Sequence, residues 1–213
     1  MLYAIGDIHG RMDRLEKLMP KINFNPKEDK IVFLGDYIDR GKKPIECLKL
    51  VKSLVEAHPK NIIALKGNHE MMMMDYYEGI DTSWTHNGWE PTRDGLKSLD
   101  VEERKKLLDW VDDLPLFHCD GKYIFVHAGI NPKYDLDSQV DIDLVWIREQ
   151  FYQNYNGDNI IVVGHTPTQS LTNDMEKNKP IFFKNILFCD TGAFIDEGKL
   201  SCVNVETLEY IQA

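Results

Sequence analysis

The feature that most constrains the fold is a pattern that recurs along the chain: a short apolar run followed by a loop rich in Gly, Asp, His and Asn. The apolar runs span 2–5, 30–34, 61–65, 123–126 and 159–163, and the loops after them span 6–10, 35–41, 67–70, 127–129 and 164–166. Helix-like stretches follow the first three loops. Repeated strand–loop–helix units predict a mainly parallel sheet covered by helices, and therefore an α/β protein.

One segment, about 76–118, departs from this pattern. It holds Trp84, Trp89 and Trp110 and a charged stretch at 102–106, and we expect a mostly helical insertion over one end of the sheet. The tryptophans Trp84 and Trp89 either line a substrate cleft or pack the insertion. Two later segments, 181–189 and 200–211, are rich in β-branched and aromatic residues and predict antiparallel strands. With no repeat or linker in the sequence, we expect one domain over residues 1–213.

Composition excludes several classes of protein. The formal net charge of −10 argues against general nucleic-acid binding, which depends on Lys and Arg. Four cysteines without a CxxC pair predict reduced thiols and neither a zinc ribbon nor a disulfide framework. No apolar segment approaches the roughly 20 residues that cross a bilayer, and no basic segment precedes the first apolar run. We therefore expect a cytoplasmic protein that makes no membrane contact, and a monomer.

The recurring loops supply side chains that bind metal ions. Asp7 and His9 lie two residues apart, so an extended backbone would point both the same way. The full set of candidate ligands is Asp7, His9, Asp36, Asn68, His127 and His165. Two carboxylates, three imidazoles and one amide, with no thiolate, suit Mn²⁺, Fe or Zn²⁺ better than Cu(I) or an iron–sulfur cluster. Six ligands exceed one tetrahedral site and suit two ions that share a bridging ligand.

These loops also resemble a known family. The motifs are GDIHG at 6–10, GDYIDRG at 35–41, GNHE at 67–70, HAG at 127–129 and GHT at 164–166. In this order they resemble the motif set of the PPP serine/threonine protein phosphatases, in particular the small bacterial and bacteriophage-lambda type, and the segment 188–193 is similar to the closing strand of that family. The resemblance implies the calcineurin-like metallophosphoesterase fold, a four-layer α/β/β/α sandwich with a dimetal site at the strand-end loops.

The resemblance also implies a role for individual residues. Asp7, His9 and Asp36 would hold the first metal ion, and Asp36 would bridge to a second one completed by Asn68, His127 and His165. Arg40 would bind the substrate phosphate, and Arg148, two residues after Trp146, would be a second phosphate-binding arginine. His69 would protonate the leaving oxygen while Asp39 holds it as an imidazolium. The implied cofactors are two divalent ions, with Mn²⁺ expected and Fe or Zn as alternatives.

These roles agree with the chemistry of phosphate esters. Two cations lower the pKa of a bridging water, so that hydroxide forms near neutral pH and attacks phosphorus. Arginine forks match phosphate oxygens in a bidentate manner. A serine alkoxide is a poor leaving group, and general acid catalysis contributes about 10²–10⁴-fold. We therefore predict a metal-dependent phosphomonoester hydrolase, and within that class a serine/threonine protein phosphatase, acting on a phosphorylated protein or a small phosphoester.

Three alternatives remain open at this point. Symmetrical dinucleoside tetraphosphate hydrolases share the metal motifs, but usually lack an aspartate where this chain has Asp39 and tend to carry Asp where it has Glu70. A phosphatase acting broadly on small molecules fits the same residues. A binding module that has lost catalysis is disfavoured, because all six ligand positions, His69 and Asp39 are filled.

Overall fold

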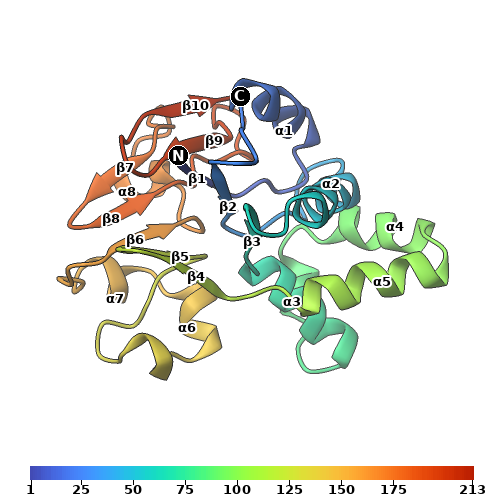
Figure 1. Cartoon of the computed structure of the whole chain (residues 1–213). Helices are drawn as coiled ribbons and strands as arrows, with labels where there is room; N and C mark the ends of the chain where they lie inside the picture. Colours follow the sequence, from blue (N-terminus) through green and yellow to red (C-terminus); the bar gives the residue numbers. More distant parts are fainter.

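Two five-stranded sheets form the centre of the protein, as seen in a computed structural model that describes residues 1–213 (Figure 1). The first sheet has the order β10–β9–β1–β2–β3, with β1 at Leu2–Ile5, β2 at Lys30–Phe33, β3 at Ile62–Ala64, β9 at Ser201–Asn204 and β10 at Tyr210–Gln212. The strands β1, β2 and β3 are parallel, and β9 pairs antiparallel with both β1 and β10. The predicted parallel arrangement is therefore confirmed for the first three strands.

The second sheet has the order β4–β5–β6–β8–β7. Its strands are β4 at Phe117–Asp120, β5 at Tyr123–Val126, β6 at Ile160–Val163, β7 at Ile181–Phe183 and β8 at Ile186–Phe188. The central strands β5, β6 and β8 are parallel, while β4 and β7 pair antiparallel at the two edges. The segment 181–189 thus forms the predicted antiparallel hairpin, and its second strand also joins β6 in a parallel pair.

Both faces of the inner strands are buried, which explains why their sequences are continuously apolar. Leu2 and Ala4 of β1 pack with Phe125 and Val162 of the second sheet in a shared apolar layer. Tyr3 of β1 points to the opposite face, into the larger apolar cluster that the helices cover. Because side chains alternate along a strand, each sheet contributes one face to the inter-sheet layer and one to a helical layer. The predicted four-layer fold is confirmed.

Helices cover the outer faces of the two sheets (Figure 1). On the side of the first sheet lie α1 (Met12–Leu18), η1 (Met19–Lys21), α2 (Pro44–Ala57) and α3 (Asn68–Glu78). The connections of the second sheet carry η3 (Leu136–Ser138), α6 (Asp141–Trp146), α7 (Glu149–Tyr152) and α8 (Thr168–Thr172). Pro44 begins α2, where its missing N–H costs nothing, and Gly79 ends α3 in the left-handed conformation. No helix is both long and apolar enough to span a membrane.

The insertion is helical, as predicted, but its bounds differ from 76–118. Tyr76 still belongs to α3, and Phe117 already belongs to β4, so the added elements are η2 (Ser83–His86), α4 (Glu90–Ser98) and α5 (Val101–Asp112). These elements lie beside α2 and α3 (Figure 1). Trp84 is fully buried, and its ring lies 5.2 Å from that of Trp89. The aromatic pair therefore packs the insertion onto the sheet domain.

The inter-sheet layer yields a stability prediction. Phe125 is fully buried there, so Phe125→Ala removes a large side chain from a region that cannot collapse freely. We expect the free energy of unfolding to fall by about 3–5 kcal/mol in urea denaturation. Phe183→Ala is the matched control, because Phe183 is 55% exposed, and should change stability by only about 0.5 kcal/mol. Similar losses in the two variants would contradict the assigned core.

Candidate metal centre

The carboxyl ends of five parallel strands, from both sheets, converge on one site. The loops after β1, β2, β3, β5 and β6 bring together all six predicted ligand side chains, Asp7, His9, Asp36, Asn68, His127 and His165. Each of these residues is buried, with at most 5% of its surface exposed. In open α/β sheets ligands bind beyond the carboxyl ends of the strands, and the sequence pattern places the polar residues at that edge.

Asp36 occupies the centre of this cluster. Its Oδ2 lies 3.4 Å from Nε2 of His9, and its Oδ1 lies 3.5 Å from Nε2 of His127. Two groups of potential ligand atoms share Asp36, one with His9 and His69 and the other with His127 and His165. Burial raises the pKa of Asp36, but the positive charge that the surrounding imidazoles carry when protonated outweighs burial and lowers this pKa below its usual value. An ionised carboxylate with one oxygen toward each group has the arrangement of a bridging ligand.

Backbone carbonyls select the tautomer of two imidazoles. Nδ1 of His9 donates to the carbonyl oxygen of Ile38 at 2.9 Å, and Nδ1 of His127 donates to that of Leu34 at 2.8 Å. A carbonyl only accepts, so each Nδ1 carries the proton and each Nε2 presents a lone pair. Burial lowers the pKa of both imidazoles below their usual value. The two rings are therefore neutral, which is the form that binds a metal ion.

The second group of ligands fits a cation because acceptor atoms converge there. Oδ1 of Asn68 lies 2.9 Å from Nε2 of His127 and 2.9 Å from Nδ1 of His165. Nε2 of His127 is an acceptor in the tautomer fixed by Leu34, so two lone pairs face each other without a proton between them. Nε2 of His165 is buried without any partner. A positive ion would satisfy these groups, whereas the protein alone does not.

Several site residues adopt a backbone conformation that is uncommon for side chains other than glycine. The φ angles are 47° for His9, 53° for Asp36, 68° for Asp39, 64° for Arg40 and 63° for His165. Such left-handed residues cost about 1–3 kcal/mol each and persist only where the surroundings hold them. Half of the ten positive-φ residues other than glycine therefore lie in the motif loops, where the bends aim side chains into the cluster.

Glu70 holds two of these loops together. Its Oε2 accepts hydrogen bonds from the backbone N–H groups of Asp36 at 2.8 Å and Gly67 at 3.0 Å, and its Oε1 accepts one from Tyr37 at 2.9 Å. Burial and the charge of Asp36 raise the pKa of Glu70 to about 8, and the donated N–H groups oppose this rise. Sequence reasoning gave Glu70 no structural role, although its place at the third residue of α3 is typical of a capping box.

His69 and Asp39 form the predicted pair, and the insertion completes it. Nδ1 of His69 lies 2.6 Å from Oδ2 of Asp39. The same carboxylate accepts from Nε1 of Trp84 at 2.8 Å and from Oγ1 of Thr92 at 2.6 Å. Burial lowers the pKa of His69, but Asp36 and Asp39 outweigh it and raise that pKa above its usual value. Trp84 and Thr92, which sequence reasoning missed, therefore orient the carboxylate that holds His69.

Both predicted arginines reach the cluster. Nη1 of Arg40 lies 2.9 Å from Nε2 of His9, and its Nη2 lies 3.1 Å from Nε2 of His69. Arg148 donates to Oγ1 of Thr166 at 2.8 Å. Arg40 and Arg148 line the same cavity of about 100 Å³, together with four of the six candidate ligands, His9, Asp36, Asn68 and His165. The guanidinium of Arg40 lies against Nε2 of His9, so the cluster accepts positive charge at an atom expected to bind metal.

Other residues around the cluster escaped sequence reasoning. Asn87 of the insertion and Trp146 of α6 line the small cavity. Asp190 is fully buried, one of its carboxylate oxygens has no partner, and burial raises its pKa to about 6. Asp190 follows strand β8, so the same strand-then-loop pattern could have identified it. Asn87 carries no comparable signal, because it reaches the site from the insertion.

Comparison with known proteins identifies the family of the chain. Residues 2–202 match the family model of the calcineurin-like phosphoesterases. The chain is 34% identical over 148 residues to a symmetrical bis(5′-nucleosyl)-tetraphosphatase from Dechloromonas aromatica, an alignment that covers 67% of this chain and 50% of that protein. A protein of the same name from Actinobacillus succinogenes is 36% identical over 137 residues, or 63% of this chain and 46% of its own length. The chain thus spans about half the length of these curated relatives.

Solved structures agree on the fold. A protein described as a candidate diadenosine tetraphosphatase superposes with a TM-score of 0.75 and 16% identity, over 100% of this chain and 92% of its own. A serine/threonine phosphatase from Saccharomyces cerevisiae gives a TM-score of 0.68 and 17% identity, over 100% of this chain and 78% of its own. At such identities the likeness concerns the fold alone. The two curated relatives above carry the name of the dinucleoside tetraphosphate hydrolases, the alternative considered above, and not that of the protein phosphatases.

The position of Glu70 leads to a prediction about metal binding. Glu70→Gln keeps the size of the side chain but replaces one acceptor oxygen by an NH₂ group that faces a backbone N–H donor. We expect the free energy of unfolding to fall by about 2 kcal/mol and the affinity for Mn²⁺ to fall at least ~10-fold, as measured by urea denaturation and titration calorimetry. Glu78→Gln, at the exposed end of the same helix, is the control. Wild-type Mn²⁺ affinity in Glu70→Gln would show that Glu70 does not position Asp36.

Proposed function

The chain belongs to the calcineurin-like phosphoesterase family, and we propose that it is a metal-dependent phosphoester hydrolase whose substrates are dinucleoside tetraphosphates. The observation that carries this proposal is the arrangement of three cavities. The small cavity at the metal cluster shares Arg40 with a cavity of about 620 Å³, and shares Trp146 and Arg148 with another of about 420 Å³. A substrate cut at its centre needs room for a nucleotide on each side of the attacked phosphorus.

We assign the ligand roles as the sequence predicts them. Asp7, His9 and Asp36 would hold one ion, and Asp36, Asn68, His127 and His165 the other. The convergence of unprotonated acceptors at Asn68 and His127 supports this assignment, because a cation removes the conflict between their lone pairs. The mixed oxygen and nitrogen ligands make Mn²⁺ the expected metal. When bound, two such cations neutralise phosphate oxygens and lower the pKa of water so that it attacks near neutral pH.

The protein's own residues orient the substrate and manage its charge. Arg40 and Arg148 reach the small cavity from different loops and would bind phosphate oxygens in a bidentate manner. Charge builds up on those oxygens as water attacks, so both arginines would contribute to the transition state as well as to binding. His69 would donate its proton to the leaving oxygen, and Asp39 would hold the imidazole in place and keep it protonated.

A second candidate function is supported by the His69–Asp39 pair itself. A serine or threonine alkoxide is a poor leaving group and needs a proton, whereas the phosphate of a departing nucleoside diphosphate is already stable as an anion. The buried acid His69, whose partner Asp39 accepts three hydrogen bonds, is therefore more useful to a phosphoprotein phosphatase than to a dinucleoside tetraphosphate hydrolase. We keep serine/threonine protein phosphatase activity as the alternative, and substrate competition decides between the two.

The metal assignment leads to a prediction about activation. Hydrolysis of p-nitrophenyl phosphate should disappear after exhaustive chelation and return most fully with Mn²⁺. Among ligand variants, Asp36→Asn should lower kcat the most, because only Asp36 faces both groups of ligand atoms. His118→Asn is the control, since His118 lies on strand β4, outside the cluster. Full activity in the chelated enzyme would contradict a metal-dependent mechanism.

The substrate proposal is tested by kcat/KM on three compounds with the same Mn²⁺-loaded enzyme. We expect diadenosine tetraphosphate to be preferred over phosphoseryl peptides by at least ~10-fold in kcat/KM, with ADP as the only nucleotide product. His69→Asn should cost about 10²-fold on the phosphoseryl peptide and far less on diadenosine tetraphosphate and p-nitrophenyl phosphate, whose leaving groups are stable anions.

Two outcomes would overturn parts of this proposal. A preference for phosphoseryl peptides would favour the protein phosphatase. If His69→Asn lowered kcat/KM by the same factor on all three substrates, His69 would position phosphate and donate no proton. Asp39→Asn provides an internal comparison, because it should show the same dependence on the leaving group in a milder form.

A further inference from the structure

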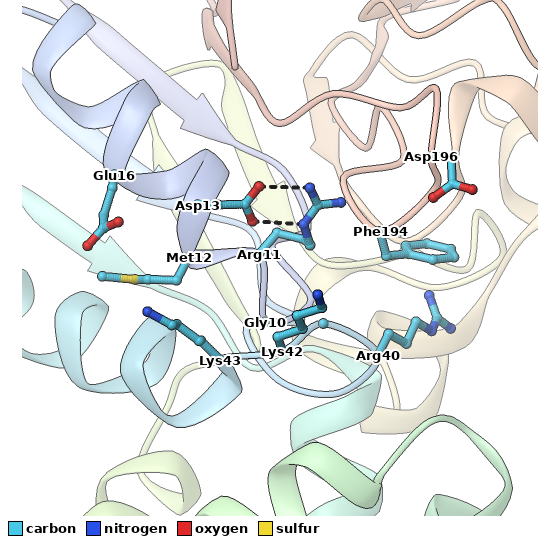
Figure 2. A pocket seen from close by; sticks show the side chains of 11 residues that line it. Gly10, Arg11, Met12, Asp13, Glu16, Arg40, Lys42, Lys43, Phe194 and Asp196 are labelled. Carbon is cyan, nitrogen blue, oxygen red and sulfur yellow. Dashed lines mark hydrogen bonds and ion pairs between the residues drawn. The ribbon is translucent and has the colours of Figure 1, made fainter.

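A large cavity lies beside the metal cluster, and none of its lining residues other than Arg40 also lines the small cavity at that cluster. The volume of the large cavity is about 620 Å³, within the range of about 300–1,000 Å³ that is typical of small-molecule sites. Three segments form it: the loop after β1 with the start of α1, the loop 40–43 after β2, and the loop that carries Phe194 and Asp196 (Figure 2). The first two segments follow strands of the first sheet, and the third joins β8 of the second sheet to β9 of the first.

We propose that this cavity binds the nucleoside diphosphate half of the substrate, with its phosphates against Lys42 and Lys43. The inference rests on the proposed function, because it takes the attacked phosphate to be at the metal cluster. Arg40 lines both the small and the large cavity, so a phosphate chain that starts at the cluster can continue past Arg40 into the larger space. Lys42 and Lys43 follow Arg40 on the same loop.

The charges around the cavity support an anionic occupant. Among the lining residues the one ion pair joins Arg11 and Asp13 through two contacts of 2.8 Å, so these two charges cancel (Figure 2). Lys42 and Lys43 are exposed and have no acidic partner among the lining residues. The remaining acids, Glu16 and Asp196, lie on opposite sides of the cavity from each other (Figure 2).

With the Arg11–Asp13 pair cancelled, three cations face two acids. The cavity is therefore a locally positive site on a chain with a net charge of −10. Such a site attracts a polyanion more strongly than its surroundings do.

The wall formed by Phe194 is built before any ligand binds. Arg14 is buried and donates to the carbonyl oxygens of Gly198, Ile195 and Asp196, and Arg11 donates to that of Ala193 at 2.9 Å. These bonds attach the loop that carries Phe194 to α1. A preformed wall reduces the entropy that binding would otherwise cost.

Phe194 in turn fixes the arginine that joins the two cavities. The guanidinium carbon of Arg40 lies 4.1 Å from the centroid of the Phe194 ring, and the same ring lies edge-on to His9 at 5.0 Å. Stacking contacts only the face of the guanidinium, so the N–H donors in its plane stay directed at the metal cluster, beside Nε2 of His9 and of His69. The cavity and the metal cluster are thus coupled through one preorganised side chain.

The chemistry of the lining also predicts what the cavity does not recognise. Only two of its 11 lining residues are hydrophobic. One of them, Phe194, already has a face covered by Arg40. Recognition of a base by stacking is therefore weak, and we expect the cavity to bind the diphosphate with little preference among nucleobases.

The test uses inhibition of p-nitrophenyl phosphate hydrolysis, so it does not require turnover of any dinucleotide. The probes are ADP, GDP and orthophosphate, with Mn²⁺ held constant. We expect ADP and GDP to inhibit with similar Ki values, both lower than that of orthophosphate. In the double variant Lys42→Ala/Lys43→Ala, the ratio of the Ki for ADP to the Ki for orthophosphate should rise about 10-fold.

Controls separate a local effect from loss of charge or of folding. Lys105→Ala/Lys106→Ala also removes two lysine charges, but from the exposed face of α5. This variant should leave the Ki ratio within ~2-fold of wild type. Lys42→Glu/Lys43→Glu should raise the ratio further than the alanine variant, since it adds repulsion. Urea midpoints equal to wild type show that each variant is folded.

Each outcome decides the inference separately from the proposed function. A Ki ratio in Lys42→Ala/Lys43→Ala equal to that of wild type overturns the assignment of the cavity, whether or not diadenosine tetraphosphate is a substrate. An effect confined to kcat/KM on acidic phosphopeptides would also overturn it and would identify the cavity as a peptide site. If the ratio rises but diadenosine tetraphosphate is not hydrolysed, the diphosphate site stands and the proposed substrate falls.

Discussion

Four backbone N–H groups converge on the buried carboxylate of Glu70 and join the loop after β2 to the loop after β3. This contact matters because Asp36 sits in a left-handed conformation with a φ of 53°, which its own sequence does not favour. Gly67 must also lack a side chain, since a Cβ there would lie 2.2 Å from Oδ1 of Asp36. The central carboxylate of the site is thus placed by Glu70 and Gly67, which are not among the candidate ligands, and both groups of ligand atoms share it.

The insertion takes part in the site and does more than cover it. Trp84 and Thr92 donate to the carboxylate of Asp39, and the carbonyl oxygen of Gly88 accepts from the backbone N–H of Arg40 at 2.8 Å. Asp39 and Arg40 both have positive φ angles, so these contacts stabilise a strained pair of residues. A change in the insertion would therefore alter His69 and Arg40 together.

The sequence predicts the parts of the site that follow from strand order, and misses those that depend on long-range contacts. All six candidate ligands, the His69–Asp39 pair and Arg40 come together as expected, because each lies in a loop that follows a strand or at the helix start after it. Arg148 also reaches the site, but it lies between α6 and α7, and its prediction rests on a short motif resemblance and not on strand order. Thr92 and Trp84 escape prediction, because no local pattern marks a hydroxyl or an indole N–H that meets a carboxylate about 50 residues away. Their function follows only from the packing of α4 and η2 against the loop after β2.

Substrate class is harder to predict than metal chemistry, because it too depends on contacts between segments far apart in the sequence. The ligand motifs are common to dinucleoside tetraphosphate hydrolases and protein phosphatases, so they fix the reaction and leave the choice of substrate open. The choice rests on Arg40, where three features meet: its guanidinium points at His9 and His69, it stacks on Phe194, and its backbone is held by Gly88. Since Arg40 lines both cavities, an anion in the larger one would contact the residue that we propose orients the reacting phosphate. Binding energy from a remote diphosphate can therefore reach the transition state, which is the advantage a large substrate has over a simple monoester.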